Sequence, residues 1–187
     1  KDRDRCLLER KEITGQLSFM IKEILDTSRL DFTQEKQDAE TFDLSERLPA
    51  ICEPYQLIAK AKGLDFSFSI QGKCPVHTSK KSLEKILSNL LSNAVKYTPA
   101  GGKIAVSVVL WEMYVEIKVT DTGKGISESN QAAIFRRFYR EEEVHEQQGV
   151  GIGLYLAREI VTRQGGYIKV VSEPGKGSEF SIMLPTR

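Results

Sequence analysis

The feature of this sequence that most constrains its fold is the way the spacing of apolar residues changes along the chain. Spacings of three and four residues indicate amphipathic helices, whereas alternation and β-branched runs indicate strands. Helix patterns cover 7–30, 43–62, 83–97 and 154–164, and strand patterns cover 64–70, 103–110, 114–120, 167–172 and 178–184. We therefore expect an α+β fold, a two-layer α/β sandwich with a mixed sheet and helices on one face, preceded by a long N-terminal helix.

A polar stretch divides the chain. Residues 31–40, DFTQEKQDAE, show no periodicity, as is typical of a linker. We expect an N-terminal helical segment over 1–32, a linker over 33–40 and a compact domain over 41–187. Within that domain, residues 122–153 are rich in glycine, glutamine and charge, which predicts a long loop with a short helix.

Charge and composition exclude several classes of protein. The 27 basic residues nearly balance the 26 acidic ones, for a net charge of +1, which argues against a nucleic-acid-binding surface. The widely spaced Cys6, Cys52 and Cys74 form no CxxC pair, so neither a zinc site nor a disulfide framework is indicated. No apolar run reaches the about 20 residues of a membrane helix. We expect a soluble fragment without direct membrane contact.

Two asparagines stand four residues apart in the helix pattern over 83–97. Asn89 and Asn93 therefore share one face, while neighbouring leucines turn to the core. Amide oxygens stacked in this way can reach a magnesium ion that bridges phosphates, and Lys96 on the same side can contact a phosphate. A solvated polar helix face is the alternative interpretation of the same spacing.

The segment DTGKGI directly follows a strand pattern. It places the Asp121 carboxylate at the strand end, and Gly123 and Gly125 where backbone can pass close to a ligand. A buried carboxylate there can accept a hydrogen bond from a purine amino group and reject a guanine edge. An ordinary turn remains the alternative.

A second glycine-rich segment, GVGIGL, opens the last helix. Backbone amides of Gly149, Gly151 and Gly153, with the helix start at Leu154, would form an anion site without any side chain. The segment lacks the Lys-Ser/Thr ending of a Walker loop, and a flexible hinge is the alternative.

The apolar residues Phe135 and Phe138 lie before this segment and predict the core stripe of a small helix. Arginines surround them, and one, such as Arg140, could stabilise charge on a transferring phosphoryl group. A solvated face is the alternative for these arginines.

Taken together and in order, these segments closely resemble the N, G1, F and G2 boxes of the sensor histidine kinases of two-component systems. The resemblance covers 41–187, and the final GYIKVVSEPGKGSEFSIMLP resembles that family's last hairpin. ILDTSRL, over 24–30, resembles the end of its second dimerisation helix. The resemblance implies a Bergerat-type ATP-binding fold. Glycopeptide-resistance sensors are one subfamily considered, although no residue decides for them.

The same resemblance implies roles for individual residues around bound ATP and Mg²⁺. Catalytic roles fall to Asn89, Lys96 and Arg140, and metal binding falls to Asn89 and Asn93. Asp121 would bind the adenine amino group, with Tyr97 against the adenine ring. Further nucleotide contacts would come from Gly123 and Gly125 beside the ring, and from Gly149, Gly151, Gly153 and Leu154 around the phosphates.

The implied partners are ATP, a response regulator and the dimerisation domain of the same kinase, which is homodimeric in full length. The implied location is the cytoplasmic side of an inner- or plasma-membrane sensor. The alternative functions are those of an ATPase of the gyrase and Hsp90 type and of a non-catalytic nucleotide-binding regulator. Such ATPases carry a glutamate where this chain has Asn89, and an amide cannot act as a general base. Asn89, Asn93 and the three glycines of GVGIGL argue against the regulator, because such a protein would have lost the residues that bind the phosphates.

The phosphoacceptor is the departure from the family pattern. The family's acceptor histidine precedes an acidic residue and then a basic-Thr-Pro segment, whereas this chain has only His77 and His145, neither in that context. We expect both to be structural or surface histidines, and the acceptor helix to be absent from this fragment.

Overall fold

The structure is a computed structural model that describes residues 5–7, 10–11, 14, 21, 38–136, 139 and 153–187. At the N-terminus, the few described residues up to 21 are all helical, which agrees with that part of the helix predicted over 7–30. The rest of the predicted helix and most of the predicted linker, residues 22–37, lie outside the described residues. Within the described residues, no helix is both long enough and apolar enough to cross a membrane.

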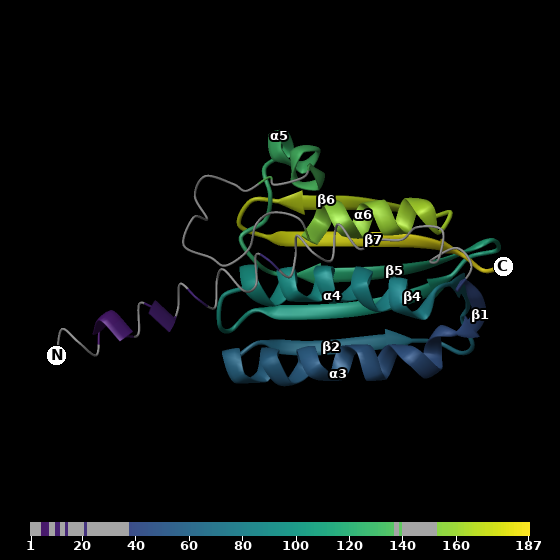
Figure 1. Cartoon of the computed structure of the whole chain (residues 1–187), viewed down its shortest axis with the longest axis horizontal. Helices are drawn as coiled ribbons and strands as arrows, with labels where there is room; N and C mark the ends of the chain where they lie inside the picture. The colour runs from purple at the N-terminus through teal and green to yellow at the C-terminus, as the bar shows by residue number, and fades with distance from the viewer. Residues whose placement is uncertain are drawn as a thin grey trace.

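A five-stranded mixed sheet forms one layer of the protein (Figure 1). Its spatial order is β2-β4-β5-β7-β6. Only the β2–β4 pair is parallel, and the other three pairs are antiparallel. The strands are β2 (Asp65–Ile70), β4 (Lys103–Leu110), β5 (Tyr114–Asp121), β6 (Tyr167–Glu173) and β7 (Gly177–Pro185). The predicted strand patterns are confirmed to within one or two residues.

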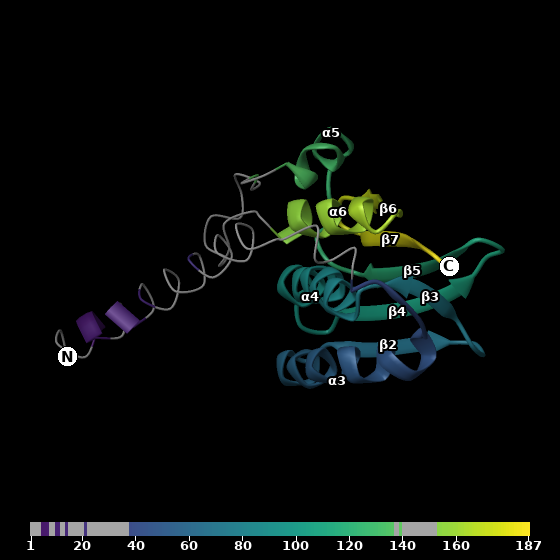
Figure 2. The ribbon, with the colours of Figure 1, turned by 45° about the vertical axis from the view of Figure 1, so that its right-hand side comes forward.

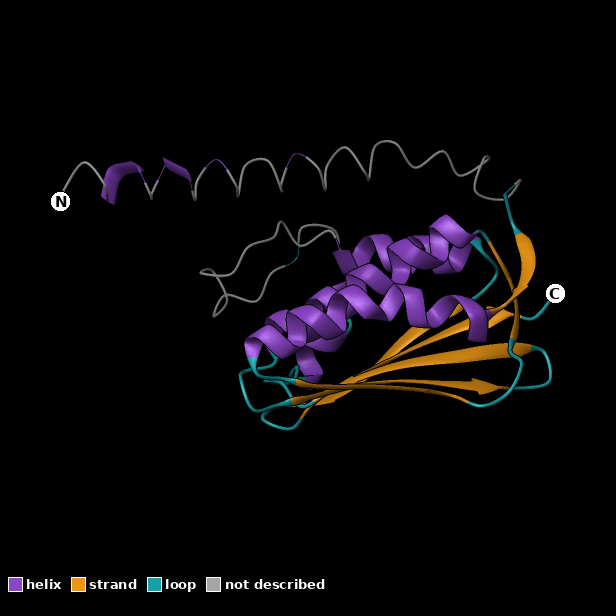
Figure 3. Cartoon of the chain, turned by 90° about the horizontal axis from the view of Figure 1, so that it is seen from below, coloured by secondary structure: helices purple, strands orange, loops and turns teal. Residues whose placement is uncertain are grey.

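Three helices form the second layer and cover a single face of the sheet (Figure 3). They are α3 (Leu44–Lys62), α4 (Lys80–Tyr97) and α6 (Gly153–Arg163). Figure 2 shows α3 beside β2, with α4 next to it and α6 beside β6 and β7. This arrangement confirms the predicted two-layer sandwich with a mixed sheet.

The ends of the helices follow the capping residues of the sequence. Asp43 caps α3 by accepting a hydrogen bond from the Ser45 amide at 3.0 Å, and Gly63 ends the helix at a φ of 79°. Ser79 caps α4 by accepting from the Ser82 amide at 3.3 Å. At its other end, α4 ends at Tyr97, whose carbonyl oxygen accepts a hydrogen bond from the Lys124 amide in the loop after β5.

A small second sheet was not predicted as such. β1 (Glu40–Asp43) pairs antiparallel with β3 (Pro75–Thr78), so the last residue of the expected linker lies in a strand. Four-residue strands are too short to show a period. His77 lies in this sheet, where its Nδ1 is 3.0 Å from the Thr41 hydroxyl, which agrees with a structural histidine. His145 lies outside the described residues.

The apolar core lies between the helices and the sheet, and α4 contributes the longest row of buried residues. Leu83, Ile86, Leu87, Leu90 and Leu91 are all at most 1% exposed. At the C-terminal end of α6, the Gln164 side-chain oxygen accepts hydrogen bonds from Thr78 and Ser79, at 3.0 and 3.2 Å. Packing and this polar link hold α6 against the start of α4.

Truncation of a buried side chain of α4 should destabilise the protein. We expect Leu87→Ala to lower the free energy of unfolding by about 2–5 kcal/mol, because Leu87 is fully buried and the cavity cannot close completely. Urea denaturation measures the effect. The matched control is Leu57→Ala on α3, where the side chain is 66% exposed and a change within about 0.5 kcal/mol is expected. Equal losses in the two variants would contradict this account of the core.

Candidate functional site

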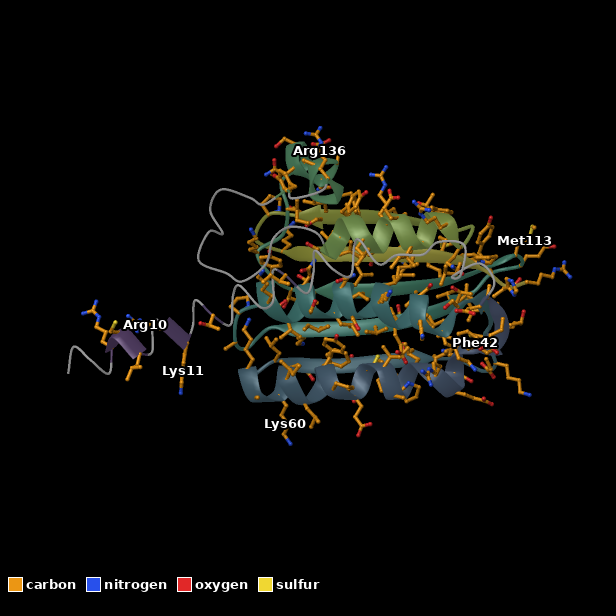
Figure 4. All side chains as sticks on the ribbon, in the orientation of Figure 1. Arg10, Lys11, Phe42, Lys60, Met113 and Arg136 are labelled. Carbon is orange, nitrogen blue, oxygen red and sulfur yellow. The ribbon has the colours of Figure 1, made fainter. Side chains whose placement is uncertain are left out.

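The predicted site residues that the structure describes extend from Asn89, in the middle of α4, to one end of the sandwich. The end of α4, the end of β5, the β6–β7 turn and the start of α6 come together there, beside the short helix α5 (Glu128–Gln131) (Figure 1). A 3-10 helix, η1 (Ala133–Phe135), follows α5. Figure 4 shows Arg136, which follows η1, at the upper edge of the view, well away from Met113 in the β4–β5 turn at the right.

Asp121 is the last residue of β5 and is only 8% exposed. Its Oδ1 accepts a hydrogen bond from the Gly123 amide at 2.8 Å, and the Ser178 amide also donates to the carboxyl group. Burial raises the pKa of Asp121 above its ordinary value, while these two amide donors pull it down. The result is a buried, oriented hydrogen-bond acceptor at a strand end.

The glycines after Asp121 are required by contacts with other backbone segments. A Cβ atom at Gly123 would lie 2.5 Å from the carbonyl oxygen of Tyr97, at the end of α4. At Gly125, where φ is 72°, it would lie 2.1 Å from the carbonyl oxygen of Glu173, at the end of β6. The sequence analysis expected close approach to a ligand at these glycines, and the structure shows close approach to protein backbone.

The asparagine pair lies on the half-buried face of α4, with the leucines turned to the core as predicted. A Cβ atom added to Gly153 would lie 3.3 Å from Oδ1 of Asn89, so this amide faces the first residue of α6. Leu154 follows and packs partly buried against the core. The structure thus brings Asn89 and the start of α6 together.

Two lysines lie over the ring of Tyr97, the last residue of α4. The ammonium nitrogen of Lys96 is 5.2 Å from the ring centroid, and that of Lys124 is 5.3 Å away. Cations at this distance are attracted to the ring face. The sequence analysis assigned Lys96 and Tyr97 to the site but gave no role to Lys124, which an isolated DTGKGI pattern does not single out.

Several predicted residues lie outside the described residues: Arg140, Gly149, Gly151 and Phe138. Of the predicted apolar pair, Phe135 is described and only 8% exposed. Its ring makes an edge contact with that of Phe180, with centroids 6.3 Å apart. Phe135 therefore anchors η1 to β7, as expected of a core residue.

Sequence reasoning also missed three polar residues that surround Asp121 and its loop, namely Gln131, Ser172 and Ser178. Ser172 and Ser178 flank the β6–β7 turn and pair with each other across the two strands. Their hydroxyl oxygens are 2.8 Å apart. Polar residues placed symmetrically about a PGKG turn were the signal that could have indicated such a pair.

The site suits a magnesium ion only if the ligand supplies oxygen atoms. Among the described residues, no group of three or more His, Cys, Asp or Glu side chains could hold a metal. Asn89 and Asn93 offer neutral amide oxygens, one helical turn apart and half-buried. Mg²⁺ is commonly bound through few protein ligands together with substrate phosphates, so this pair fits such a role.

Comparison with known proteins gives consistent matches. Residues 78–187 match the family described as histidine kinase-, DNA gyrase B- and HSP90-like ATPase. The adaptive-response sensory kinase SasA of Synechococcus sp. (strain JA-2-3B'a(2-13)) is 37% identical over 172 residues, which cover 91% of this chain and 46% of that protein. The chain thus spans about half the length of the curated relatives it matches.

Solved structures agree with this match. Full-length ShkA, in complex with AMPPNP, has a TM-score of 0.71 at 27% identity, covering 79% of this chain and 31% of that one. Histidine kinase ThkA, in complex with the response regulator protein TrrA, has a TM-score of 0.75 at 21% identity, covering 95% and 49%. At that identity, the second likeness shows the fold alone.

The burial of Asp121 predicts a specific pH dependence. Because burial raises the pKa of Asp121, its carboxyl group binds a proton more tightly in the folded protein than in the unfolded chain. The contribution of Asp121 to stability is therefore largest at pH values below its unfolded pKa and declines as pH rises through the folded pKa. We expect the free energy of unfolding of the parent, relative to Asp121→Asn, to fall as pH rises from about 4, the ordinary pKa of an aspartate, through the raised pKa of the folded state.

Urea unfolding of the ligand-free proteins across this pH range measures the difference. Asp65→Asn is the matched control, because Asp65 lies exposed at the start of β2. A difference between parent and Asp121→Asn that stays constant or grows with pH would contradict the assigned direction.

Proposed function

Because the chain belongs to the family of histidine kinase-, DNA gyrase B- and HSP90-like ATPases, we propose that it is the ATP-binding catalytic part of a sensor histidine kinase. The observation that carries this proposal is the buried Asp121 carboxylate, oriented by two backbone amides. The loop after it contacts the end of α4, the helix on which Asn89 faces the start of α6. The proposed site thus combines a hydrogen-bond acceptor for the nucleotide base with a polar helix face for the phosphates.

Adenine recognition falls to the β5 end of the site. The Asp121 carboxylate accepts a hydrogen bond from the adenine amino group, and it disfavours guanine, whose carbonyl oxygen would meet the carboxylate instead. Tyr97 contacts the ring, and Gly123 and Gly125 keep the backbone beside it free of side chains. The absence of side chains at Gly123 and Gly125 lets the loop pack on Tyr97 and Glu173, and the proposed base would lie beside the backbone held in this way.

Phosphate binding falls to α4 and the start of α6. Asn89, Asn93 and Lys96 lie along one stretch of α4, and the N-terminus of α6 at Gly153 faces Asn89. Gly149, Gly151 and Leu154 complete this proposed phosphate contact. Mg²⁺ bound at Asn89 and Asn93 would supply positive charge to the phosphate oxygens.

The proposed reaction transfers the γ-phosphoryl group of ATP to a histidine of the kinase's dimerisation helix, for relay to a response-regulator aspartate. Such transfer depends on in-line positioning and on charge stabilisation, which we assign to Asn89, Lys96 and Arg140. Hydrolysis of the gyrase and Hsp90 type is disfavoured, because Asn89 has no basic oxygen that could take a proton from water.

The proposed organisation places the end of a dimerisation helix in 1–32, a linker in 33–40 and the catalytic domain in 41–187. Its partners are ATP, a response regulator and the dimerisation domain of a homodimeric kinase. The domain is proposed to lie on the cytoplasmic side of a membrane sensor. The solved complex of ThkA with the response regulator protein TrrA supports the response-regulator partner by analogy, and the name of the sensor histidine kinase RppB supports the kinase role.

The first test is nucleotide selectivity. We expect ATP to bind in preference to GTP, and Asp121→Asn to weaken ATP binding by about 1.5–3 kcal/mol, because it replaces a charged acceptor oxygen by a donor. Calorimetric titration of ATP with Mg²⁺ measures both effects. Asp65→Asn should bind like the parent, and an Asp121→Asn variant that also does so would refute the assignment.

The second test is phosphoryl transfer by the chain as printed. We expect ATP binding without self-phosphorylation, because His77 is engaged in the β1–β3 sheet and neither histidine has the acceptor context. A separate dimerisation hairpin bearing the acceptor histidine should restore weak transfer, since the tether that raises effective concentration is missing. Radiolabelled ATP reports on both reactions.

Acid-labile label on this chain alone, lost in His77→Gln or His145→Gln, would show that the acceptor lies within it. Label on the separate hairpin, absent with Asn89→Ala, is the result expected of a kinase.

A further inference from the structure

The loop that follows Asp121 is tied to its surroundings by two side chains outside the predicted site. Gln131, the last residue of α5, donates through Nε2 to the carbonyl oxygens of Ile126 and Ser172, at 3.2 and 2.9 Å. These two carbonyls belong to the 122–126 loop and to β6. A single amide group therefore joins three elements: α5, the loop and the sheet.

Ser172 makes a second set of contacts at the same junction. Its hydroxyl oxygen accepts from the Ile126 amide at 2.8 Å and donates to the carbonyl oxygen of Gly177 at 2.8 Å. Because a hydroxyl carries one proton, the 2.8 Å contact with Ser178 requires Ser178 to donate. The amide of the same Ser178 donates to the Asp121 carboxyl group. Ser172 is thus linked through Ile126 to the loop that follows Asp121, and through Ser178 to a residue whose amide donates to the Asp121 carboxyl group.

Backbone contacts show that the loop rests on the β6–β7 turn and has little freedom to move alone. The Gly175 amide donates to the carbonyl oxygen of Lys124 at 2.7 Å. Close approach of Gly125 to Glu173, and of Gly177 to Asp121, leaves no room for side chains between them. A shift of β6 or α5 relative to the loop would therefore also displace Asp121.

We propose that Gln131 and Ser172 form a hydrogen-bonded clasp that positions the 122–126 loop, and with it the Asp121 acceptor, for recognition of the nucleotide base. This inference rests on the proposed function for its ligand, but not for its hydrogen bonds. Both are positioning residues, since they act through the loop and Asp121. The clasp also attaches α5 to the base-binding end of the site.

The chemistry of the clasp makes its requirements specific. Position 131 must donate, because it faces two carbonyl oxygens, so Gln131→Glu replaces attraction by repulsion at nearly constant shape. Position 172 must carry a hydroxyl, which Ser172→Thr retains in a strand and Ser172→Ala removes. A defect in the positioning of the base weakens the binding of every nucleotide that carries this base, whatever its number of phosphates.

The experiment compares the Kd values of ATP, ADP, AMP and GTP for Gln131→Glu, Ser172→Ala and Ser172→Thr. We expect Gln131→Glu and Ser172→Ala to raise the Kd values of ATP, ADP and AMP by a similar factor of about ten, because each variant loses one or two hydrogen bonds. The preference for ATP over GTP should narrow, and Ser172→Thr should stay within about twofold of the parent. Controls are Gln71→Glu, in an exposed loop, and Ser129→Ala, whose hydroxyl contacts only Ser127 in the described structure.

Hydrogen exchange without nucleotide provides a readout that does not depend on the ligand. The Ile126 amide, which donates to Ser172, should exchange faster in Gln131→Glu and Ser172→Ala than in the parent, Ser172→Thr and the two controls. Circular dichroism and thermal unfolding establish that each variant is folded. A variant that fails to fold is replaced by Gln131→Leu, which removes the donor without adding charge.

The outcomes separate the clasp from the proposed function. Folded variants with unchanged affinities, or with losses confined to ATP and ADP, would overturn the clasp. If the parent binds no nucleotide, the proposed function fails, and the clasp is then judged by exchange alone. Faster exchange at Ile126 in the two disrupting variants supports it, and unchanged exchange overturns it.

Discussion

The buried carboxylate of Asp121 is the constraint around which this end of the protein is arranged. A carboxylate that is 8% exposed needs hydrogen bonds to compensate for lost hydration, and two backbone amides provide them. These amides come from opposite directions, one from the loop after β5 and one from the start of β7. The site therefore exists only if β7 pairs with β5 in the observed register, with Ser178 opposite Asp121.

That register in turn depends on glycines that permit backbone segments to touch. A side chain at Gly177 would place its Cβ atom 1.9 Å from the carbonyl oxygen of Asp121, and one at Gly125 would collide with Glu173. The glycine-rich character of this end therefore has a structural origin. Dense backbone packing leaves a rigid edge on which a flat base could lie, with the polar residues of α4 nearby.

α4 connects the core to the site through its two faces. Its leucines are buried between the helices and the sheet, so the helix cannot rotate without exposing them. Asn89 and Asn93 are consequently held on the opposite, half-buried face, and Asn89 lies against the first residue of α6. The packing of the apolar face of α4 therefore sets the direction in which the two amides point.

The sequence by itself determined most of the elements and the family. The periods of apolar residues predicted the three core helices and all five strands of the main sheet, because long amphipathic segments carry their own signal. Box order and spacing indicated the family and pointed to Asn89, Lys96, Tyr97 and Asp121 as neighbours. β1 and β3 were not predicted as a sheet because four residues show no usable period.

Only the tertiary structure decided what surrounds Asp121. That the Gly123 and Gly125 contacts are made with Tyr97 and Glu173, and that Gln131 and Ser172 meet at Ile126, depends on strand pairing and helix packing between segments far apart in the sequence. Hydrogen-bond partners at such separations follow from register and packing, which local residue patterns do not encode. The sequence therefore identified the acceptor, and the fold decided which groups hold it in place.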